Sequence, residues 1–325
     1  MTKAHSSSAA GAASTAFFYH PIFLEHDTGY GHPERSERLQ AILAALEEEA
    51  LGPRLLRIEP GPAPLEAIER NHKRSYIDLV RRECADGSGQ LSTGDTTISA
   101  ETWEASLRAA GAACQAVDLI VAGRVRNAFC AVRPPGHHAR PGGGMGFCVF
   151  NNLAIGVRHA RAKHGLARAL IVDWDLHHGN GTQETFYEDA AVMQFHTHQG
   201  GIYPGTGWPD ERGGGDAEGN IMNYPLRPGC GIEVFEHLYR EELVPAARRF
   251  KPDIVFVSAG YDSHRDDPLG MLGLEEEGFA RLATIVNGLA DELCGGRLVL
   301  SLEGGYNIEA QGASVAATIR VLTGG

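Results

Sequence analysis

The chain has 325 residues, of which 43% are hydrophobic and 22% charged, and its formal net charge is -12. That length suffices for one large α/β domain, or two ordinary ones, with a sizeable core. The acidic balance argues against general nucleic-acid binding and against docking on anionic lipid, and no apolar run is long enough to span a bilayer. Cationic small molecules and basic peptide tails suit such a surface better. The six cysteines are scattered without a CxxC pair, which is typical of reduced thiols and predicts a cytoplasmic protein.

Along the chain, residues 1–15 are small and polar, so we expect a disordered N-terminal tail followed by one domain over residues 16–325. Short apolar runs predict strands at 16–19, 128–132, 169–174, 191–196, 253–260 and 297–305. Amphipathic periodicity predicts helices at 33–50, 100–122, 152–164, 232–250, 274–293 and 308–322. This alternation is typical of an α/β fold with a parallel sheet covered by helices on both faces. Ligands bind at the carboxyl ends of the strands in such sheets.

Ionisable residues gather at one predicted strand end, in the stretch "LIVDWDLHHGNGT" (170–182). If the strand stays extended, Asp173, Asp175 and His177 project to one side because side chains alternate with a period of two. Three such groups are costly to bury unless they are paired or coordinated. An ion pair or a solvated turn is the simplest alternative, but the stretch contains no Lys or Arg to neutralise two Asp. The spacing therefore favours a ligand site.

Three further strand ends carry polar groups: His137 and His138 in "RPPGHHA", three Asp in "YDSHRDDPLG", and Tyr306 in "EGGYN". Asp and His without Cys suit a divalent ion, Zn²⁺ first, with Fe²⁺, Mn²⁺ or Co²⁺ as alternatives. A metal ion activates water, a His moves its proton, and a Tyr hydroxyl donates to a developing oxyanion. The combination predicts metal-assisted hydrolysis of an amide.

Long motifs connect the chain to a known family: "GHPERSERLQAI", "VRPPGHHA", "GFCVFNN", "VDWDLHHGNGTQ", "YPGTG", "SAGYDSHRDDPLG" and "LEGGYN". From about residue 19 to 322 the sequence resembles the histone deacetylase and acetylpolyamine amidohydrolase family, which has the arginase/deacetylase fold. The resemblance implies a single domain with about eight parallel strands. It also implies zinc-dependent removal of acetyl or other acyl groups from acyl-lysine side chains or acylated polyamines. Asn180 and Glu303 resemble class II and bacterial members.

The resemblance assigns roles to individual positions. Three positions match the metal ligands: Asp175, His177 and Asp267. Five match the catalytic residues: His137, His138, Asp173, Asn180 and Tyr306. Five match the substrate channel and its rim: Asp95, Phe147, Tyr203, Gly304 and Gly305. The family's structural K⁺ ion is also implied, although His196 stands where relatives have a Ser that helps to bind it.

The position of Asn180 has a physical consequence. Asp173 matches the carboxylate that orients His137, whereas Asn180 orients His138. An amide aligns an imidazole without stabilising its charged form as a carboxylate would. We therefore expect His138 to stay neutral and serve as general base and then acid, and His137 to carry charge.

Two other functions are alternatives to this one. A two-metal, arginase-like ureohydrolase needs additional Asp ligands, and "DWDLHH" offers an incomplete set. A non-catalytic acyl-lysine binding module has no need for competent residues at every catalytic position. Among substrates, acetyl-lysine proteins, acetylated polyamines and other N-acyl amines all fit, and the oligomeric state is open.

Overall fold

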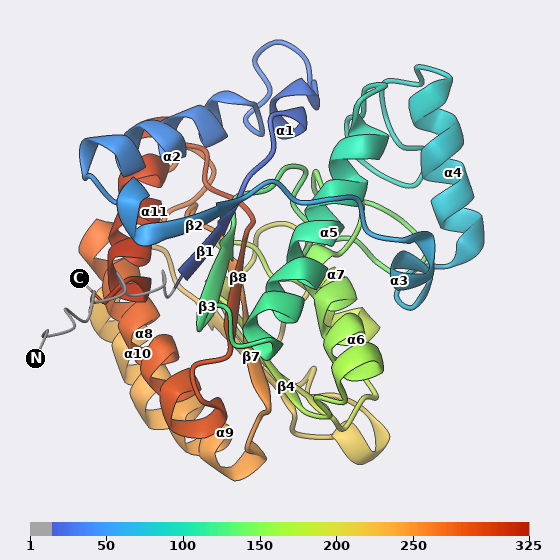
Figure 1. The fold of residues 1–325 in the computed structure, drawn as a ribbon. Coiled ribbons are helices and arrows are strands. Elements are labelled where there is room, and N and C mark those ends of the chain that lie inside the picture. The colour runs from blue at the N-terminus through green and yellow to red at the C-terminus, as the bar shows by residue number, and fades with distance from the viewer. Residues whose placement is uncertain (1–14, 325) are drawn as a thin grey trace, which may run out of the picture.

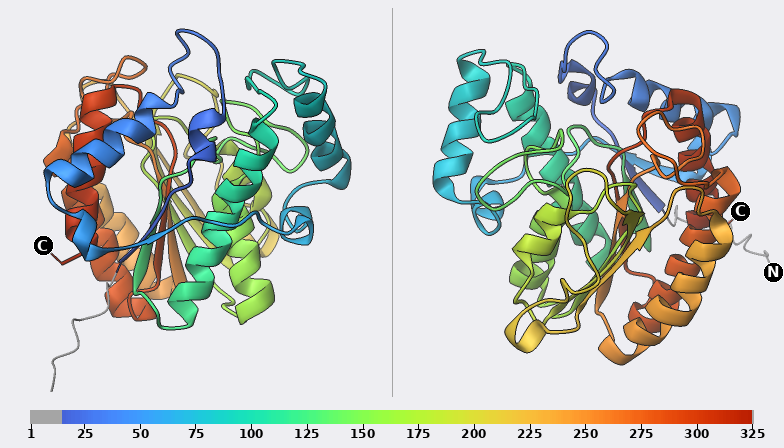
Figure 2. Two further views of the ribbon diagram at one scale, coloured as in Figure 1. Left: turned by 45° about the horizontal axis from the view of Figure 1, so that its top comes forward. Right: turned by 180° about the vertical axis from the view of Figure 1, so that it is seen from behind.

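The computed structural model describes residues 15–324, which form a central parallel sheet between two layers of helices (Figures 1 and 2). The strand order is β2-β1-β3-β8-β7-β4-β5-β6, and every neighbouring pair is parallel. The strands are β1 (Thr15–Phe18), β2 (Leu55–Ile58), β3 (Asn127–Cys130), β4 (Ala169–Asp173), β5 (Val192–Gln199), β6 (Ile221–Leu226), β7 (Ile254–Ala259) and β8 (Leu298–Leu302). The predicted fold class is confirmed.

The six strands predicted from apolar runs are all present, because each is buried between the two helix layers. Thr15, which was predicted to belong to the tail, is instead the buried first residue of β1. The rest of the predicted tail lies outside the described residues. At the other end of the chain, β8 stops at Leu302, so the predicted strand residues 303–305 leave the sheet and enter the site described below.

Two strands were missed, and both lie at the edges of the sheet. β2 is partly exposed, and β6 contains Pro225, which has no N–H to donate. An edge strand has a neighbour on one side only, so it tolerates proline and needs fewer apolar residues. Its sequence therefore carries a weaker strand pattern.

Helices cover both faces of the sheet. On one face α2, α10 and α11 pack together, and α5 packs on α6 against the other (Figures 1 and 2). The helices are α1 (Ile22–Glu25), α2 (Glu37–Glu48), α3 (Leu65–Glu69), α4 (Arg74–Ala85), α5 (Thr102–Val121), α6 (Asn152–His164), α7 (Asn180–Thr185), α8 (Ile232–Leu238), α9 (Val244–Phe250), α10 (Glu276–Cys294) and α11 (Ile308–Leu322). Short 3₁₀ segments lie at η1 (Gly52–Arg54) and η2 (Gly215–Ala217). None of the helices described here is long and apolar enough to cross a membrane.

The helix predicted over residues 232–250 is interrupted at its centre. A π-helical turn, η3 (Tyr239–Leu243), separates α8 from α9, and Pro245 lies in the first turn of α9. Proline lacks the N–H for a hydrogen bond in the helix interior, and a π-turn accommodates that loss without ending the helix.

A second, smaller hydrophobic cluster lies beside α5 and was missed. Helix α4 buries Tyr76, Ile77 and Val80 there, and Phe150 packs on the same cluster. The Tyr76 hydroxyl donates to the Val149 carbonyl at 2.6 Å. These contacts support the loop that carries the aromatic motif "GFCVFNN".

Candidate active site

The carboxyl end of β4 brings three predicted groups together. Asp173 Oδ1 accepts a hydrogen bond from Asp175 N at 3.1 Å, and Asp175 Oδ1 accepts one from His177 N at 2.8 Å. Asp175 Oδ2 accepts a further bond from Gly304 N, at the end of β8, at 2.8 Å. Asp173 and Asp175 are buried, so this edge of the sheet places two carboxylates in a low-dielectric environment.

The loop after β3 carries the adjacent histidines. His137 Nδ1 lies 3.1 Å from Asp173 Oδ2, and His138 Nδ1 lies 2.8 Å from Asn180 Oδ1. Both rings are buried, and their centroids are 4.0 Å apart. The side-chain partners of both histidines are therefore those expected from the sequence.

The two rings differ in their electrostatic surroundings. Burial alone lowers the pKa of His137, but the carboxylates of Asp175 and Asp173 outweigh it and raise the pKa to about 10. Burial also lowers the pKa of His138, and the neighbouring His137 and His177 lower it further, so it falls well below its usual range. One histidine therefore carries charge while the next stays neutral.

A donor set for a metal ion lies beside them. Single ligand atoms of Asp175, His177 and Asp262 all lie within 4.8 Å of one another. His177 Nδ1 is 3.2 Å from Asp175 Oδ1 and 3.1 Å from Asp262 Oδ2. Within residues 15–324 the salt bridges of these two carboxylates are with histidines alone. Burial and then the charge of Asp175 raise the pKa of Asp262 to about 7. Such excess buried negative charge fits a divalent cation.

Asp267, the predicted third ligand, is not part of that three-residue group. Its Oδ2 accepts hydrogen bonds from Tyr306 N at 2.6 Å and Asn307 N at 3.2 Å, and its Oδ1 accepts one from Leu269 N at 2.9 Å. It is nevertheless close enough for its charge to raise the pKa of Asp262. Its role as a ligand stays a prediction.

A cavity of about 280 Å³ opens onto these groups and is lined by Asp95, His138, Gly146, Phe147, His177, Ile202, Tyr203, Leu269 and Tyr306. Phe147 has a positive φ of 65°, which is rare for a bulky residue and often marks a functional site. Its ring meets that of His32 edge-on at 4.6 Å. Gly146 is required beside it because a Cβ there would collide with the His138 ring. A larger hollow of about 720 Å³ beside β6 contains no His, Asp or Cys in its lining.

Tyr306 is held against the same cavity by its backbone and its ring. Its ring centroid lies 6.0 Å from that of Phe147 and 5.1 Å from the guanidinium of Arg38. Burial, followed by the negative charge of Asp262, raises the pKa of Tyr306 well above its usual value. The phenol is therefore protonated at neutral pH and available as a hydrogen-bond donor.

The remaining channel residues occupy two different places. Asp95 Oδ1 accepts a hydrogen bond from Gly146 N at 2.7 Å, and the Tyr203 hydroxyl lies 3.5 Å from the same oxygen. Gly304 lies beside the carboxylates, where a Cβ would collide with Asp262, and the Gly305 carbonyl accepts a bond from Arg38 Nε at 2.6 Å. Contact of either glycine with substrate stays a prediction.

Two residues of the site received no role from the sequence. Asp262 closes the group around His177, and Glu303 Oε2 accepts hydrogen bonds from Gly136 N at 2.6 Å and His137 N at 3.0 Å. Glu303, which directly follows β8, thereby holds the backbone of the histidine pair across 166 positions of the chain. The signal for both was a carboxylate within three residues of the end of a buried strand.

His196, which stands in place of the family's cation-binding Ser, lies on β5 beside the site. Its Nδ1 is 3.6 Å from Asp173 Oδ2, and its Nε2 lies 3.2 Å from Gln194 Oε1. An imidazole thus faces the carboxylate that orients His137. The K⁺ ion stays a prediction.

Comparison with known proteins identifies the family of the chain. The histone deacetylase domain family matches residues 32–322. Chloroplastic histone deacetylase 10 of Oryza sativa subsp. japonica is 44% identical over 309 residues, which cover 90% of this chain and 70% of that protein. Polyamine deacetylase HDAC10 of Homo sapiens is 37% identical over 327 residues, 95% of this chain and 48% of that protein. The crystal structure of the HDA15 HD domain superposes with a TM-score of 0.91 at 37% identity, covering 97% of this chain and 89% of that one. The chain belongs to the histone deacetylase domain family and has the fold of its deacetylase hydrolases.

Proposed function

We propose that this protein hydrolyses the amide bond of N-acylated amines, acyl-lysine side chains or acylated polyamines, with one Zn²⁺ ion per chain. Family membership and the donor set around His177 support this proposal. Asp175, His177 and Asp267 would hold the ion, with Asp262 beside His177 Nδ1. A bound Zn²⁺ ion would supply Lewis acidity and lower the pKa of water.

His138 would act as the general base and then the general acid. Asn180 Nδ2 donates to Met145 Sδ at 3.4 Å, so Asn180 Oδ1 faces His138 and accepts its Nδ1–H. That tautomer leaves the Nε2 lone pair of His138 free, and His138 lines the cavity. Because the ring is neutral, it takes a proton from water and later returns it to the leaving amine.

His137 and Tyr306 would stabilise charge in the transition state. His137 lies beside Asp173, whose carboxylate favours the protonated ring, so it would contribute positive potential without transferring a proton itself. The protonated phenol of Tyr306 would donate to the carbonyl oxygen as that oxygen becomes negative.

The shape and charge of the cavity support an extended acyl-amine substrate. Phe147 and Tyr203 line a volume of about 280 Å³, which suits an alkyl stem, and Asp95 offers a carboxylate at the same cavity. One relative is named as a histone deacetylase and another as a polyamine deacetylase, so both substrate classes are proposed here.

The placement of His137 beside Asp173 and of His138 beside Asn180, with His138 at the cavity, carries this proposal, and turnover tests it. We expect the zinc-loaded protein to release acetate from an acetyl-lysine peptide or an acetylated polyamine. His138→Ala should remove nearly all turnover while substrate binding, measured by calorimetry, persists. His237→Ala, an exposed histidine at the end of α8, is the matched control and should keep wild-type turnover. Absence of turnover on every acyl amine, or an active His138→Ala enzyme, would refute the proposal.

The third metal ligand has its own test. Elemental analysis of Asp267→Ala should show loss of the catalytic ion. Asp262→Ala should retain part of the ion with weakened affinity, because Asp262 accepts a hydrogen bond from Leu176 N and orients the His177 ring. Full occupancy in Asp267→Ala together with loss in Asp262→Ala would transfer the ligand role to Asp262.

A further inference from the structure

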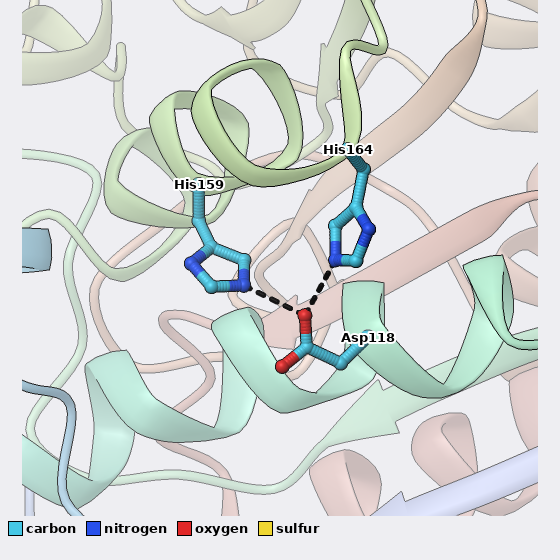
Figure 3. A group of neighbouring side chains, drawn as sticks. All are labelled: Asp118, His159 and His164. Atoms are coloured by element: carbon cyan, nitrogen blue, oxygen red, sulfur yellow. Dashed lines mark hydrogen bonds and ion pairs between the residues drawn. The ribbon is translucent and has the colours of Figure 1, made fainter.

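A second set of convergent metal-ligating side chains lies at the crossing of α5 and α6 (Figure 3). His159 Nε2 lies 2.8 Å from Asp118 Oδ1, and His164 Nε2 lies 2.6 Å from the same oxygen. Single ligand atoms of the three residues all fall within 4.8 Å of one another. None of the three lines the catalytic cavity.

The regular geometry of α6 does not by itself bring the two histidines together. His159 and His164 are five residues apart, which separates them by roughly 140° around a regular helix. Both rings nevertheless point at one oxygen of α5, as Figure 3 shows. His164 is the last residue of α6, and Gly165, with a φ of 66°, ends the helix there.

The chemistry of these donors suits a divalent transition metal. Two imidazoles and one carboxylate are a common ligand set for zinc, with water completing a four-coordinate site. His159 is buried, and its Nε2 faces the same Asp118 oxygen as the Nε2 of His164. The Asp118 side chain is 32% exposed, which leaves room for water and an entry path.

We propose that Asp118, His159 and His164 form a structural Zn²⁺ site. In the present hydrogen bonds each Nε2–H donates to Asp118 Oδ1. On binding, each ring would carry its proton on Nδ1 instead and turn its Nε2 lone pair to the ion, so that coordination replaces the two hydrogen bonds. The ion would tie the end of α6 to α5. Because the rise is about 1.5 Å per residue, His164 lies roughly 18 Å along α6 from Asn152. Asn152 is the residue of α6 that donates to the Pro134 carbonyl, in the loop that carries the two catalytic histidines. Binding there should change stability and leave turnover unaffected.

Substitution of Lys163 distinguishes a metal site from a junction held by hydrogen bonds alone. Its ammonium lies 2.8 Å from Asp118 Oδ2 and its side chain is 54% exposed. A cation at that distance competes with a metal ion but would strengthen a purely hydrogen-bonded junction. Removing it should therefore tighten zinc binding, roughly threefold to tenfold, if the site is a metal site.

The experiment measures zinc per chain by mass spectrometry after equilibration of the tag-free protein with micromolar free Zn²⁺. We expect wild type and His237→Ala to hold one ion more than His164→Ala and Asp118→Asn, whose turnover should stay at the wild-type level. Because the result is a difference of one ion, it holds whether or not the catalytic site is filled. Co²⁺ should produce a second set of visible absorption bands that His164→Ala removes.

Three results would overturn the proposal. Equal zinc content in wild type and His164→Ala would show that these residues hold no ion. Zinc affinity that Lys163→Met leaves unchanged would identify the cluster as a hydrogen-bonded junction. A melting temperature of wild type that zinc leaves unchanged, while Co²⁺ bands persist in His164→Ala, would place the second ion elsewhere. His164 is partly exposed, at 17%, so its substitution tests the site without removing a core side chain.

Discussion

At the scale of single residues, the site depends on two neighbours of the same type with opposite roles. His137 and His138 differ in the group that accepts their Nδ1–H, a carboxylate for one and an amide for the other. A carboxylate stabilises an imidazolium, whereas an amide only orients the ring. One substitution at the orienting position should therefore change the pH dependence of the reaction.

Asn180→Asp should raise the pKa of His138, because the new carboxylate stabilises its protonated form. The base is then lost at a higher pH, so the acidic limb of the kcat/KM profile should move upward in pH. Asn180→Gln keeps the amide and serves as the control for altered shape. An acidic limb that stays in place in an active Asn180→Asp enzyme would mean that His138 is not the base.

Tyr306→Phe should lower kcat by about 10²–10³-fold with little change in KM, because the phenol donates most strongly to the oxyanion of the transition state. Tyr203→Phe is the matched control, since it removes the other tyrosine hydroxyl of the cavity. Steady-state kinetics on acetyl-lysine peptide decide this, with metal content checked in parallel. Wild-type kcat in Tyr306→Phe would leave Tyr306 a structural role only.

At the scale of elements, buried charges join the loop before α2 to the loop after β3. Glu34 Oε1 pairs with Arg38 at 3.0 Å, and its Oε2 pairs with Arg133 at 2.9 Å. Arg38 also donates to the Glu303 carbonyl at 2.5 Å. All three charged side chains are fully buried. Burial disfavours the Glu34 carboxylate, but Arg133 and then Arg38 outweigh it and hold its pKa well below its usual range.

Glu34→Gln should destabilise the fold by about 3–5 kcal/mol at pH 7, because it leaves two buried guanidinium groups unpaired. The folded-state pKa of Glu34 is depressed, so its contribution is present above the unfolded pKa of about 4.3 and is lost as pH falls. The difference in unfolding free energy between wild type and Glu34→Gln should therefore narrow in acid. Urea denaturation at several pH values measures this.

The control for that series is an exposed pair. Glu292 pairs with Arg248 at 2.8 Å on the surface, and Glu292→Gln should change stability little, since water screens such pairs. A Glu34→Gln protein as stable as Glu292→Gln would show that the buried network does not hold the two loops together.

At the scale of the whole molecule, the net charge of -12 surrounds a cavity that already carries Asp95. A negative field raises the local concentration of cationic substrates and weakens as salt shortens the Debye length. Cationic and uncharged substrates should therefore respond differently to salt.

The kcat/KM for an acetylated polyamine should fall several-fold between about 0.05 and 0.5 M salt, whereas a neutral capped acetyl-lysine amide should change much less. Asp95→Asn should flatten the slope for the polyamine, and Asp216→Asn, an exposed carboxylate outside the cavity, should not. Identical slopes for both substrates would exclude electrostatic steering.

Local pattern in the sequence was sufficient for the central strands, the long helices and the groups at the strand ends. Buried strands require continuous apolar runs, and parallel strands bring their carboxyl ends to one edge. From this, the grouping of Asp173, Asp175 and His177 beside the histidine pair followed. The edge strands β2 and β6 could not be predicted in this way. Each has a neighbouring strand on one side only, so its sequence carries a weaker strand pattern.

Only the tertiary structure decided which partners complete each group. Glu34 meets Arg133 across 99 positions, Glu303 meets His137 across 166, and Asp118 meets His164 across 46. No local periodicity encodes such pairs, because they depend on how whole elements pack and not on the neighbours of a residue in the chain. The protonation difference between His137 and His138 combines both sources: the sequence supplies Asp173 and Asn180, and the packing buries the rings that make the difference large.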